Sequence, residues 1–382
     1  MKTERFDISI IGGGPAGAAC AIYLSGLGFD VCLVEKKKFP REVICGEFLS
    51  GEVFRNLNEM SLTDEFYRLN PNPIKSVRFI FDDERESASP LNFPAYSLKR
   101  STFDNFLINA AENKGVNIFQ PAEVKEIIES SNIYILKIKR EGEEELQISS
   151  RILAAAYGKQ NILDKSLGRK FAGTKSNFYG VKFHLDKSNF KYFEDSEIRM
   201  HSSPGVYCGL NAVDGNTVNV CFLRYIKNNF QPSRDFLSGY IAGSRSLNKM
   251  FHPGYDKIIK SLPLWGTGNI YFGKKRPVEK GIFMVGDAAG MIAPLTGDGI
   301  GMAFQSAKLF AEITAYLHHG KITRNKAEEL YTSKWNSLFR RRILVSSIIQ
   351  KMLMNDSYRI AAKYLLSLHA GILPGLIKIT RG

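Results

Sequence analysis

The sequence predicts an α/β fold in which a discontinuous domain with a mostly parallel sheet is joined to an antiparallel β-sheet lobe and a helical C-terminal tail. Two strand-to-glycine turns, near residues 12 and 286, indicate the discontinuous domain. Alternating apolar and polar residues over 178–223 indicate the β lobe, and helical periodicity follows residue 299. The predicted boundaries are 1–60, 100–168 and 272–318 for the first domain, 61–99 and 169–271 for the β lobe, and 319–382 for the tail.

Composition limits the class of protein. The 382 residues are 44% hydrophobic and contain no apolar run of about 18 residues, so we expect a cytoplasmic protein without a membrane-spanning helix. The five cysteines are an odd number and include no CxxC pair, which argues against a disulfide framework and a zinc site. No pair of histidines has metal-ligand spacing in a convincing element, and we therefore predict no metal site.

The first 35 residues follow the order strand, glycine turn, helix and strand. Residues 6–11 and 31–35 are β-branched or apolar runs typical of buried parallel strands, and residues 15–27 suit a helix. This order is the Rossmann-like context in which a GxGxxG motif binds a dinucleotide. The glycines permit a tight turn, close approach of pyrophosphate and helix-to-strand packing, while the helix N-terminus attracts phosphate. The predicted cofactor-binding residues of this turn are Gly12, Gly14, Pro15, Ala16 and Gly17.

An acidic residue closes the second strand. Glu35 can accept hydrogen bonds from the hydroxyls of an unphosphorylated ribose, which favours FAD or NAD over NADP. The motif alone leaves FAD and NAD open.

Further segments resemble a flavoprotein superfamily that includes p-hydroxybenzoate hydroxylase, flavin halogenases and geranylgeranyl reductases. The run from Arg100 to Leu107 is similar to its RxxFDxxL helix, and Gly286–Gly301 is similar to its GDAAHxxxPxxGxG signature. The resemblance implies FAD as cofactor, an arginine at position 100 that contacts flavin, and an aspartate at position 287 that binds the ribityl chain. The predicted cofactor-binding set also includes Lys36, Arg41, Val124, Gly286, Pro294, Gly297, Gly299 and Ile300.

Two departures from the family pattern bear on the reaction. Tyr157 stands where the hydroxylases carry the aspartate of an Asp-Gly pair, which puts a standard NADPH-driven hydroxylase cycle in doubt. Residues 39–50 resemble the flavin-side segment of geranylgeranyl reductases. However, Gly209, Asn211 and Ala212 replace the Trp, Phe and Pro of that family's substrate lobe, so a polyprenyl pocket of the same form is not expected.

Two residues are candidates for catalysis. Cys45 lies in the loop that resembles the flavin-side segment, where it acts either as a reactive thiol tuned by Arg41 or as a small packing residue. Glu47 is a weaker candidate, either as a proton donor or as a solvated loop carboxylate.

The formal charge of +14 is concentrated in the tail, where residues 321–382 carry twelve Lys or Arg and three acids. No nucleic-acid-binding motif accompanies this charge, so nucleic acid is not an expected partner. Apolar clusters between the basic ones fit either a helix at an anionic membrane surface or a helix docked on the first domain.

These observations predict an FAD-dependent oxidoreductase. The preferred reaction is reduction, or the reverse desaturation, of a carbon–carbon bond in an apolar or lipid-like substrate. The alternatives are a monooxygenase acting on an aromatic or polyketide-like substrate and a non-catalytic, lipid-binding escort protein. The sequence leaves the electron donor open between NAD(P)H and a redox protein.

Overall fold

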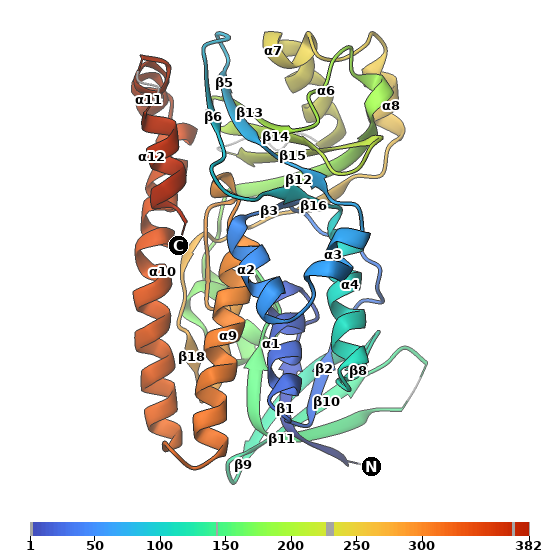
Figure 1. Cartoon of the computed structure of the whole chain (residues 1–382), viewed down its shortest axis with the longest axis vertical. Helices are drawn as coiled ribbons and strands as arrows, with labels where there is room; N and C mark the ends of the chain where they lie inside the picture. Colours follow the sequence, from blue (N-terminus) through green and yellow to red (C-terminus); the bar gives the residue numbers. More distant parts are fainter. Residues whose placement is uncertain (1–2, 143, 227–232, 369–370, 382) are drawn as a thin grey trace.

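A computed structural model describes residues 3–142, 144–226, 233–368 and 371–381 of the chain. Two sheets lie one above the other along the long axis, and the last helices run beside both of them (Figure 1). The α/β fold predicted from the sequence is confirmed, with a mostly parallel sheet below and a mostly antiparallel sheet above. Among the described residues, no helix is both long enough and apolar enough to cross a bilayer.

The lower sheet is built from segments that are far apart in the chain. Its central strands pair in parallel because helical crossovers return the chain to the same end of the sheet. Its order is β18 (Val278–Glu279), β19 (Ile282–Met284), β11 (Leu146–Ala155), β1 (Thr3–Ile11), β2 (Val31–Val34) and β8 (Asn117–Phe119). The hairpin of β9 (Glu123–Ser130) and β10 (Ile133–Lys139) extends β11.

Three helices cover this sheet. They are α1 (Pro15–Gly26), α4 (Arg100–Asn113) and α9 (Gly299–His318), and α1 packs against both of the others. The helix that the resemblance implies at Arg100–Leu107 is confirmed as α4. The small residues of α1 are almost all buried, so this helix lies between the sheet and its neighbouring helices.

The upper sheet follows the order β16 (Trp265–Thr267), β12 (Phe178–Asp186), β15 (Thr217–Tyr225), β14 (Val206–Ala212), β13 (Glu197–Ser203), β5 (Ser76–Phe81) and β6 (Glu86–Pro90). All of its pairs are antiparallel except β5 with β13. One face packs against α6 (Ser233–Gly243), α7 (Arg245–Asn248) and α8 (Tyr255–Ser261). The other face looks toward the lower half of the molecule (Figure 1).

Shorter elements connect the two halves. They are β3 (Phe48–Leu49), α2 (Gly51–Glu59), α3 (Thr63–Arg68), β4 (Asn72–Pro73), β7 (Tyr96–Ser97), α5 (Leu163–Ser166), η1 (Lys170–Gly173), η2 (Lys187–Asn189), β17 (Gly273–Lys274), η3 (Gly286–Ala288), β20 (Gly290–Met291) and η4 (Pro294–Thr296). The strands β3, β4 and β7 form a small sheet of their own.

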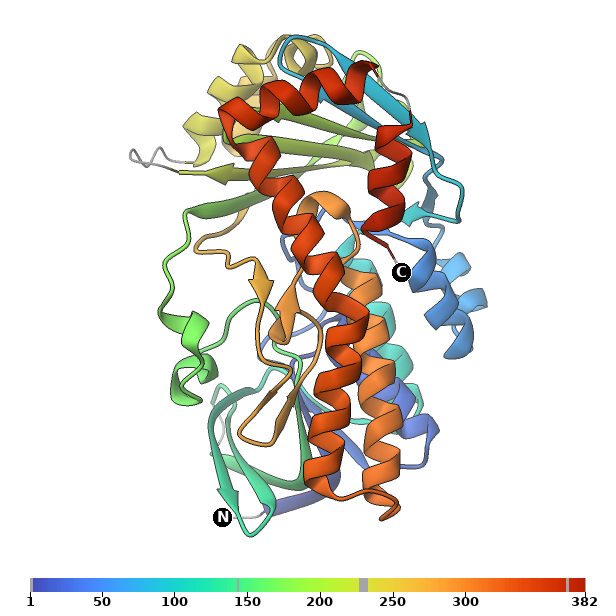
Figure 2. The ribbon, with the colours of Figure 1, turned by 90° about the vertical axis from the view of Figure 1, so that its left-hand side faces the viewer.

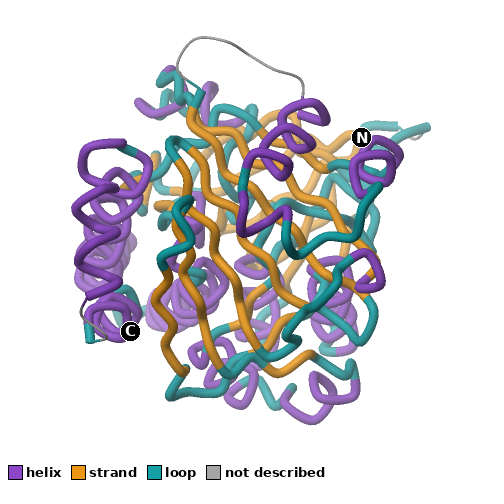
Figure 3. Tube along the Cα trace, turned by 90° about the horizontal axis from the view of Figure 1, so that it is seen from above, coloured by secondary structure: helices purple, strands orange, loops and turns teal. Residues whose placement is uncertain are grey.

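The helical tail spans the height of the molecule. Helix α10 (Arg324–Met354) lies along α9 and continues upward to α11 (Asp356–Leu368) and α12 (Ile372–Ile379), as Figure 2 shows. Seen from above, these last helices stand beside the upper sheet (Figure 3). Leu353, Leu366 and Leu373 are buried against Phe79 and Phe81 of β5, so part of the apolar stripe predicted in the tail docks on the upper sheet.

Candidate functional site

The glycine-rich segments meet at one edge of the lower sheet. Strands β1, β2, β11 and β19 are parallel, so their carboxyl ends lie at the same edge of the sheet. A glycine-rich or polar segment follows each of these ends. Gly12, Glu35, Tyr157 and Gly286 therefore share the carboxyl edge, although they are as much as 274 residues apart. A Cβ built on Gly286 would lie 2.8 Å from the Ala16 Cβ, so the two glycine motifs are in direct contact.

The three glycines of the first turn have different surroundings. Gly12 has a φ of +105°, and a Cβ there would lie 2.6 Å from the Ala156 carbonyl oxygen. A Cβ on Gly17 would lie 1.8 Å from the Gly12 oxygen, so neither position tolerates a side chain. A Cβ on Gly14 would meet only Arg41 Nη2, at 3.8 Å. Gly14 thus leaves room at the N-terminus of α1, which is where a pyrophosphate would need to approach.

A chain of charged groups connects this turn to α4. Glu35 accepts a hydrogen bond of 2.8 Å from the Gly13 N–H, and its carboxylate lies 3.6 Å from Arg41 Nη2. Arg41 Nη1 lies 3.4 Å from the carboxylate of Asp104, which accepts two further hydrogen bonds from Arg100. The Arg41 Nε is buried and has no hydrogen-bond partner among the described residues. This unsatisfied donor beside Gly14 fits an anionic ligand at the turn.

Asp287 lies at the second glycine motif. Burial raises the pKa of its carboxyl group, although Lys159, Lys275 and Arg100 oppose the shift. The Lys275 ammonium donates to the Asp287 and Lys159 carbonyls at 2.9 and 2.6 Å, and burial lowers its pKa to about 8. The backbone around Asp287 is therefore held by a buried cation that the sequence analysis did not identify.

Tyr157 makes a local network instead of supplying a carboxylate. Its hydroxyl donates to Asp164 at 2.7 Å, and Arg169 bonds the same carboxylate at 2.9 Å. The Arg169 guanidinium also donates to the Ala288 and Arg276 carbonyls at 2.8 and 3.1 Å. The hydrogen bond from Arg169 to the Ala288 carbonyl thus fastens the segment after β11 to the Gly286–Ala288 turn, and the buried ion pair with Asp164 holds Arg169 in place.

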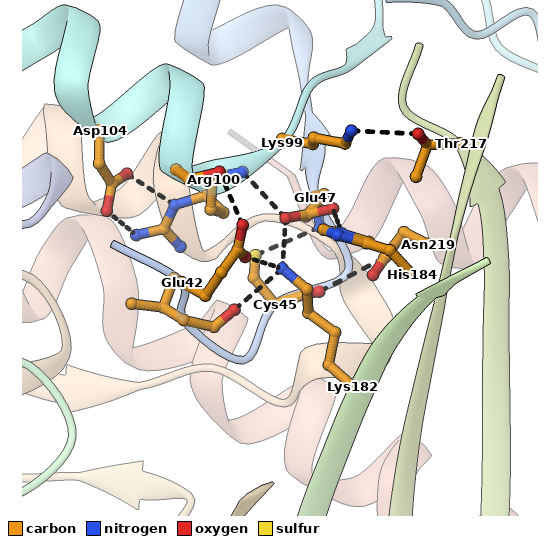
Figure 4. Close-up of polar contacts among 12 residues, drawn as sticks. Glu42, Cys45, Glu47, Lys99, Arg100, Asp104, Lys182, His184, Thr217 and Asn219 are labelled. Atoms are coloured by element: carbon orange, nitrogen blue, oxygen red, sulfur yellow. Dashed lines mark hydrogen bonds and ion pairs between the residues drawn. The ribbon is translucent and has the colours of Figure 1, made fainter. Parts of the chain in front are cut away.

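The loop that carries Cys45 lies between α4 and the upper sheet and is bonded to both (Figure 4). Lys182, on β12, donates to Glu42 at 2.7 Å, to the Val43 carbonyl at 3.2 Å and to Glu47 at 2.5 Å. Glu47 also accepts from the Arg100 N–H at 2.9 Å and contacts His184 Nε2 at 2.8 Å. Lys182 and Glu47 side chains are fully buried, so this ion pair operates in a low-dielectric setting.

The alternative of a solvated Glu47 is wrong. Its side chain is fully buried and bonded to groups from α4 and β12, because the loop folds back beneath the upper sheet. Burial alone would raise the pKa of Glu42, but hydrogen bonds from Lys182 and Ser101 outweigh it and lower that pKa. Glu42, Glu47 and His184 have ligand atoms within 4.8 Å of one another, as a metal site would require. The Lys182 ammonium bonds both carboxylates and supplies the positive charge there.

An apolar cavity of about 190 Å³ opens beside this loop. Cys45 and Gly46 line it on one side, and the turn from Pro294 to Gly297 lines it on another. Strand residues of the upper sheet form a further wall, and α10, α11 and α12 close it. The tail contributes Ile349, Leu353, Leu366, Leu373, Leu376 and Ile377. The cavity therefore joins the carboxyl-edge motifs to an aliphatic surface.

The remaining predicted cofactor-binding residues differ in burial and in their position relative to the carboxyl edge of the lower sheet. Lys36 is exposed, and Val124 is buried in the core at the start of β9. Gly299 and Ile300 form the first turn of α9, which the turn at Gly297 (φ +65°) precedes. Cys221 of β15 is half-buried and lines the cavity, whereas Cys208 of β14 is fully buried.

The sequence analysis missed Lys182 as a site residue. The signal was present, since Lys182 and His184 are polar residues that alternate with buried Val181, Phe183 and Leu185 in one strand. Alternation places both on the face opposite the apolar core, toward the loop. Only the pairing of β12 with its neighbours shows that this face meets Glu42 and Glu47.

Replacing Lys182 by Met is expected to destabilise the fold by about 3–5 kcal/mol, because it leaves the buried Glu47 carboxylate without its ammonium partner. Chemical denaturation measures the change in free energy of unfolding. Lys187→Met is the matched control: its ion pair with Asp195 is partly exposed, so its loss should change stability by about 1 kcal/mol or less. Equal stability of the two variants would contradict the structural importance of Lys182.

Comparisons with known proteins agree with this geometry. Residues 5–326 match the family model described as FAD binding domain. A digeranylgeranylglycerophospholipid reductase of Thermoplasma acidophilum is 26% identical over 330 residues, which cover 81% of this chain and 78% of the relative. A 1H-pyrrole-2-carbonyl-[peptidyl-carrier protein] brominase of Pseudoalteromonas luteoviolacea is 32% identical over 163 residues, 42% of this chain and 40% of the relative.

A solved structure shows the same fold. A geranylgeranyl bacteriochlorophyll reductase-like protein from Thermoplasma acidophilum superposes with a TM-score of 0.81 at 21% identity, covering 99% of this chain and 96% of that one. The open position at Gly14, the buried Arg41 donor and the paired glycine motifs fit FAD, the cofactor expected from the sequence. The chain therefore belongs to the FAD binding domain family and is an FAD-dependent oxidoreductase.

Proposed function

We propose that this flavoenzyme reduces, or in the reverse direction desaturates, a carbon–carbon bond in an apolar or lipid-like substrate. The observation that carries the proposal is the cavity beside Cys45 and the Pro294–Thr296 turn, whose walls are largely aliphatic and aromatic. An apolar pocket of this kind favours an apolar ligand through burial of its hydrocarbon surface. The likeness to a digeranylgeranylglycerophospholipid reductase over most of both chains supports the same reaction class.

The proposed cofactor site follows the carboxyl edge of the lower sheet. Gly14 and the N-terminus of α1 would receive the pyrophosphate, Glu35 the adenosine ribose, and Asp287 the ribityl chain. Arg41 and Arg100 would add positive charge between these contacts. When bound, FAD supplies hydride transfer, and the protein supplies binding, orientation and electrostatics.

The residues around the cavity suggest how the protein would serve the reaction. Cys45 lines the cavity, and its Sγ accepts a hydrogen bond of 3.3 Å from the Glu47 N–H. We propose that Cys45 is the catalytic residue that transfers a proton to or from the substrate. Glu47 is better placed as a positioning residue, because its carboxylate is committed to Lys182, His184 and the Arg100 N–H. Lys182 then fixes the loop that presents Cys45.

The alternative is a monooxygenase. The Tyr157–Asp164–Arg169 network occupies the position of the Asp-Gly pair of the hydroxylases, which favours the reductase. The two flavin motifs and the fitting cofactor site argue against a non-catalytic escort protein.

Dithionite-reduced holoprotein, incubated without oxygen with geranylgeraniol or an unsaturated fatty acid, should yield a product that has gained two hydrogens. Mass spectrometry measures this product, and Cys45→Ser should lower its rate of formation without lowering FAD content. A product that instead appears only in air and has gained one oxygen would establish the monooxygenase. Protein purified without flavin would favour the escort function.

Gly14→Val should abolish FAD retention, because its branched side chain would fill the space left open at the N-terminus of α1. The ratio of flavin to protein absorbance after purification measures retention, and far-ultraviolet circular dichroism checks the fold. Gly14→Ala is the matched control for steric size, since its Cβ meets only Arg41 Nη2 at 3.8 Å. Full FAD occupancy in Gly14→Val would show that the pyrophosphate lies elsewhere.

We further propose that the tail meets an anionic membrane surface. Arg342, Arg359 and Lys363 pair with carboxylates within the chain, which leaves only part of the basic charge for a partner. The outer face of α10 still combines exposed Leu344 and Ile348 with basic side chains. Leu338, Arg341 and Lys351 lie on the same exposed helical face. Such a face suits a lipid interface through apolar insertion and charge together.

Cosedimentation should show binding to phosphatidylglycerol vesicles at low salt and weak binding to neutral vesicles, with loss at high salt because exposed charges are screened. The double variant Leu344→Ser with Ile348→Ser should bind several-fold less. Leu27→Ser, an exposed leucine on the lower domain, is the control that should bind normally. Equal, negligible binding to both kinds of vesicle would leave the tail as a wall of the cavity only.

A further inference from the structure

The charge on the walls of the apolar cavity has one sign. Among the described residues that line it, the only Lys or Arg side chains are Lys159 and Arg381, and there is no Asp or Glu. Lys159 lies near Asp287, where its charge opposes the rise in carboxyl pKa that burial causes. Arg381 follows α12 and lies against the Pro294–Thr296 turn. A small, largely apolar space whose only charged lining residues are cationic favours a ligand that carries a negative charge.

Packing holds Arg381 in place, and none of the described residues pairs a carboxylate with it. Its guanidinium stacks on Phe93 and Phe48, with ring centroids 4.6 and 5.3 Å away, and Nη2 lies 3.4 Å from the Thr296 carbonyl oxygen. Its Nε and Nη1 are buried and have no hydrogen-bond partner in the described part of the chain. The side chain is thus oriented by packing, while two of its donors are unused.

Neighbouring charges do not satisfy these donors. Glu52 attracts the Arg381 charge, but its carboxylate forms its ion pair with Arg342, at 3.2 Å. Burial lowers the pKa of Arg381 to about 10, and the nearby Arg342 adds to this shift. The guanidinium remains charged at neutral pH. A cation whose buried donors are unused is unfavourable unless a ligand supplies an acceptor.

We propose that Arg381 binds the anionic group, a carboxylate or a phosphate, of an amphipathic ligand whose apolar chain lies in the cavity. Leu373, Leu376 and Ile377 of α12 line the cavity directly before Arg381 in the chain. Helix α12 therefore presents an aliphatic surface, and the chain just after it presents a guanidinium, which matches a hydrocarbon chain that ends in an anion. A planar guanidinium suits either oxyanion, because both accept paired N–H donors.

This inference rests on the proposed function and narrows its substrate to anionic amphiphiles. Binding is measured by titration calorimetry of the holoprotein with three probes of equal chain length: octanoate, octyl phosphate and 1-octanol. Both anions, or the one that the site selects, should bind at least about 10-fold more tightly than the alcohol. The comparison of octanoate with octyl phosphate tells whether the site takes a carboxylate or a phosphate.

Arg381→Gln should weaken binding of the preferred anion by about 10- to 100-fold and leave 1-octanol binding unchanged. Arg381→Lys should retain part of the preference, because the charge remains while the paired donors are lost. Lys378→Gln is the matched control, since it removes the same charge from an exposed position on α12. It should bind all three probes as the unaltered protein does.

Three results would overturn the proposal: equal affinity of the unaltered protein for the anions and the alcohol, an equal loss in Lys378→Gln, or loss of FAD from Arg381→Gln. The last would assign Arg381 to the cofactor instead. The octyl probes contain no double bond, so their binding is independent of turnover. An anion preference without alkene reduction would reject only the proposed reaction, and reduction without a preference would reject only the role of Arg381.

Discussion

The Lys182 ammonium is the point at which the two halves of the molecule depend on one another. It comes from the upper sheet, and its two carboxylate partners come from the loop that leaves the lower sheet. Glu47 in turn caps the first N–H of α4, so the loop is fixed to both sides at once. Without this ion pair, the burial of the Glu47 carboxylate would be strongly unfavourable, and the position of the Cys45 loop under the sheet would not be stable. The position of Cys45 beside the cavity follows from it.

The cavity separates two kinds of surface. The carboxyl edge of the lower sheet presents backbone N–H groups, glycines and charged side chains, which suit a phosphorylated cofactor. The upper sheet and the tail present aliphatic and aromatic side chains. Because α10, α11 and α12 supply one wall, the tail belongs to the proposed binding site as well as to the packing of the chain.

The network behind Tyr157 shows how the fold accommodates a change at a family position. Tyr157 brings no carboxylate, yet Asp164 lies within hydrogen-bond distance of its hydroxyl and is neutralised by Arg169. The Asp164 carboxylate is paired with Arg169, and the Arg169 guanidinium also donates to the Ala288 and Arg276 carbonyls. Its role is therefore structural, and it keeps the second glycine motif in place beside the first.

The sequence by itself determined the local elements and the cofactor chemistry. Gly12, Gly14, Gly17 and Glu35 were identifiable because turn conformation, close approach and strand-to-helix order are local properties of the chain. The Gly286–Asp287 pair was identifiable through its resemblance to the flavoprotein signature, which implied FAD. Tertiary structure decided the surroundings of Glu47, the ion pair of Lys182, the free donors of Arg381 and the part of the tail that lines the cavity. These features depend on contacts between residues more than 80 positions apart. Such contacts form only when the two sheets and the last helices pack together. Local sequence periodicity does not predict which charged side chains become desolvated in that packing.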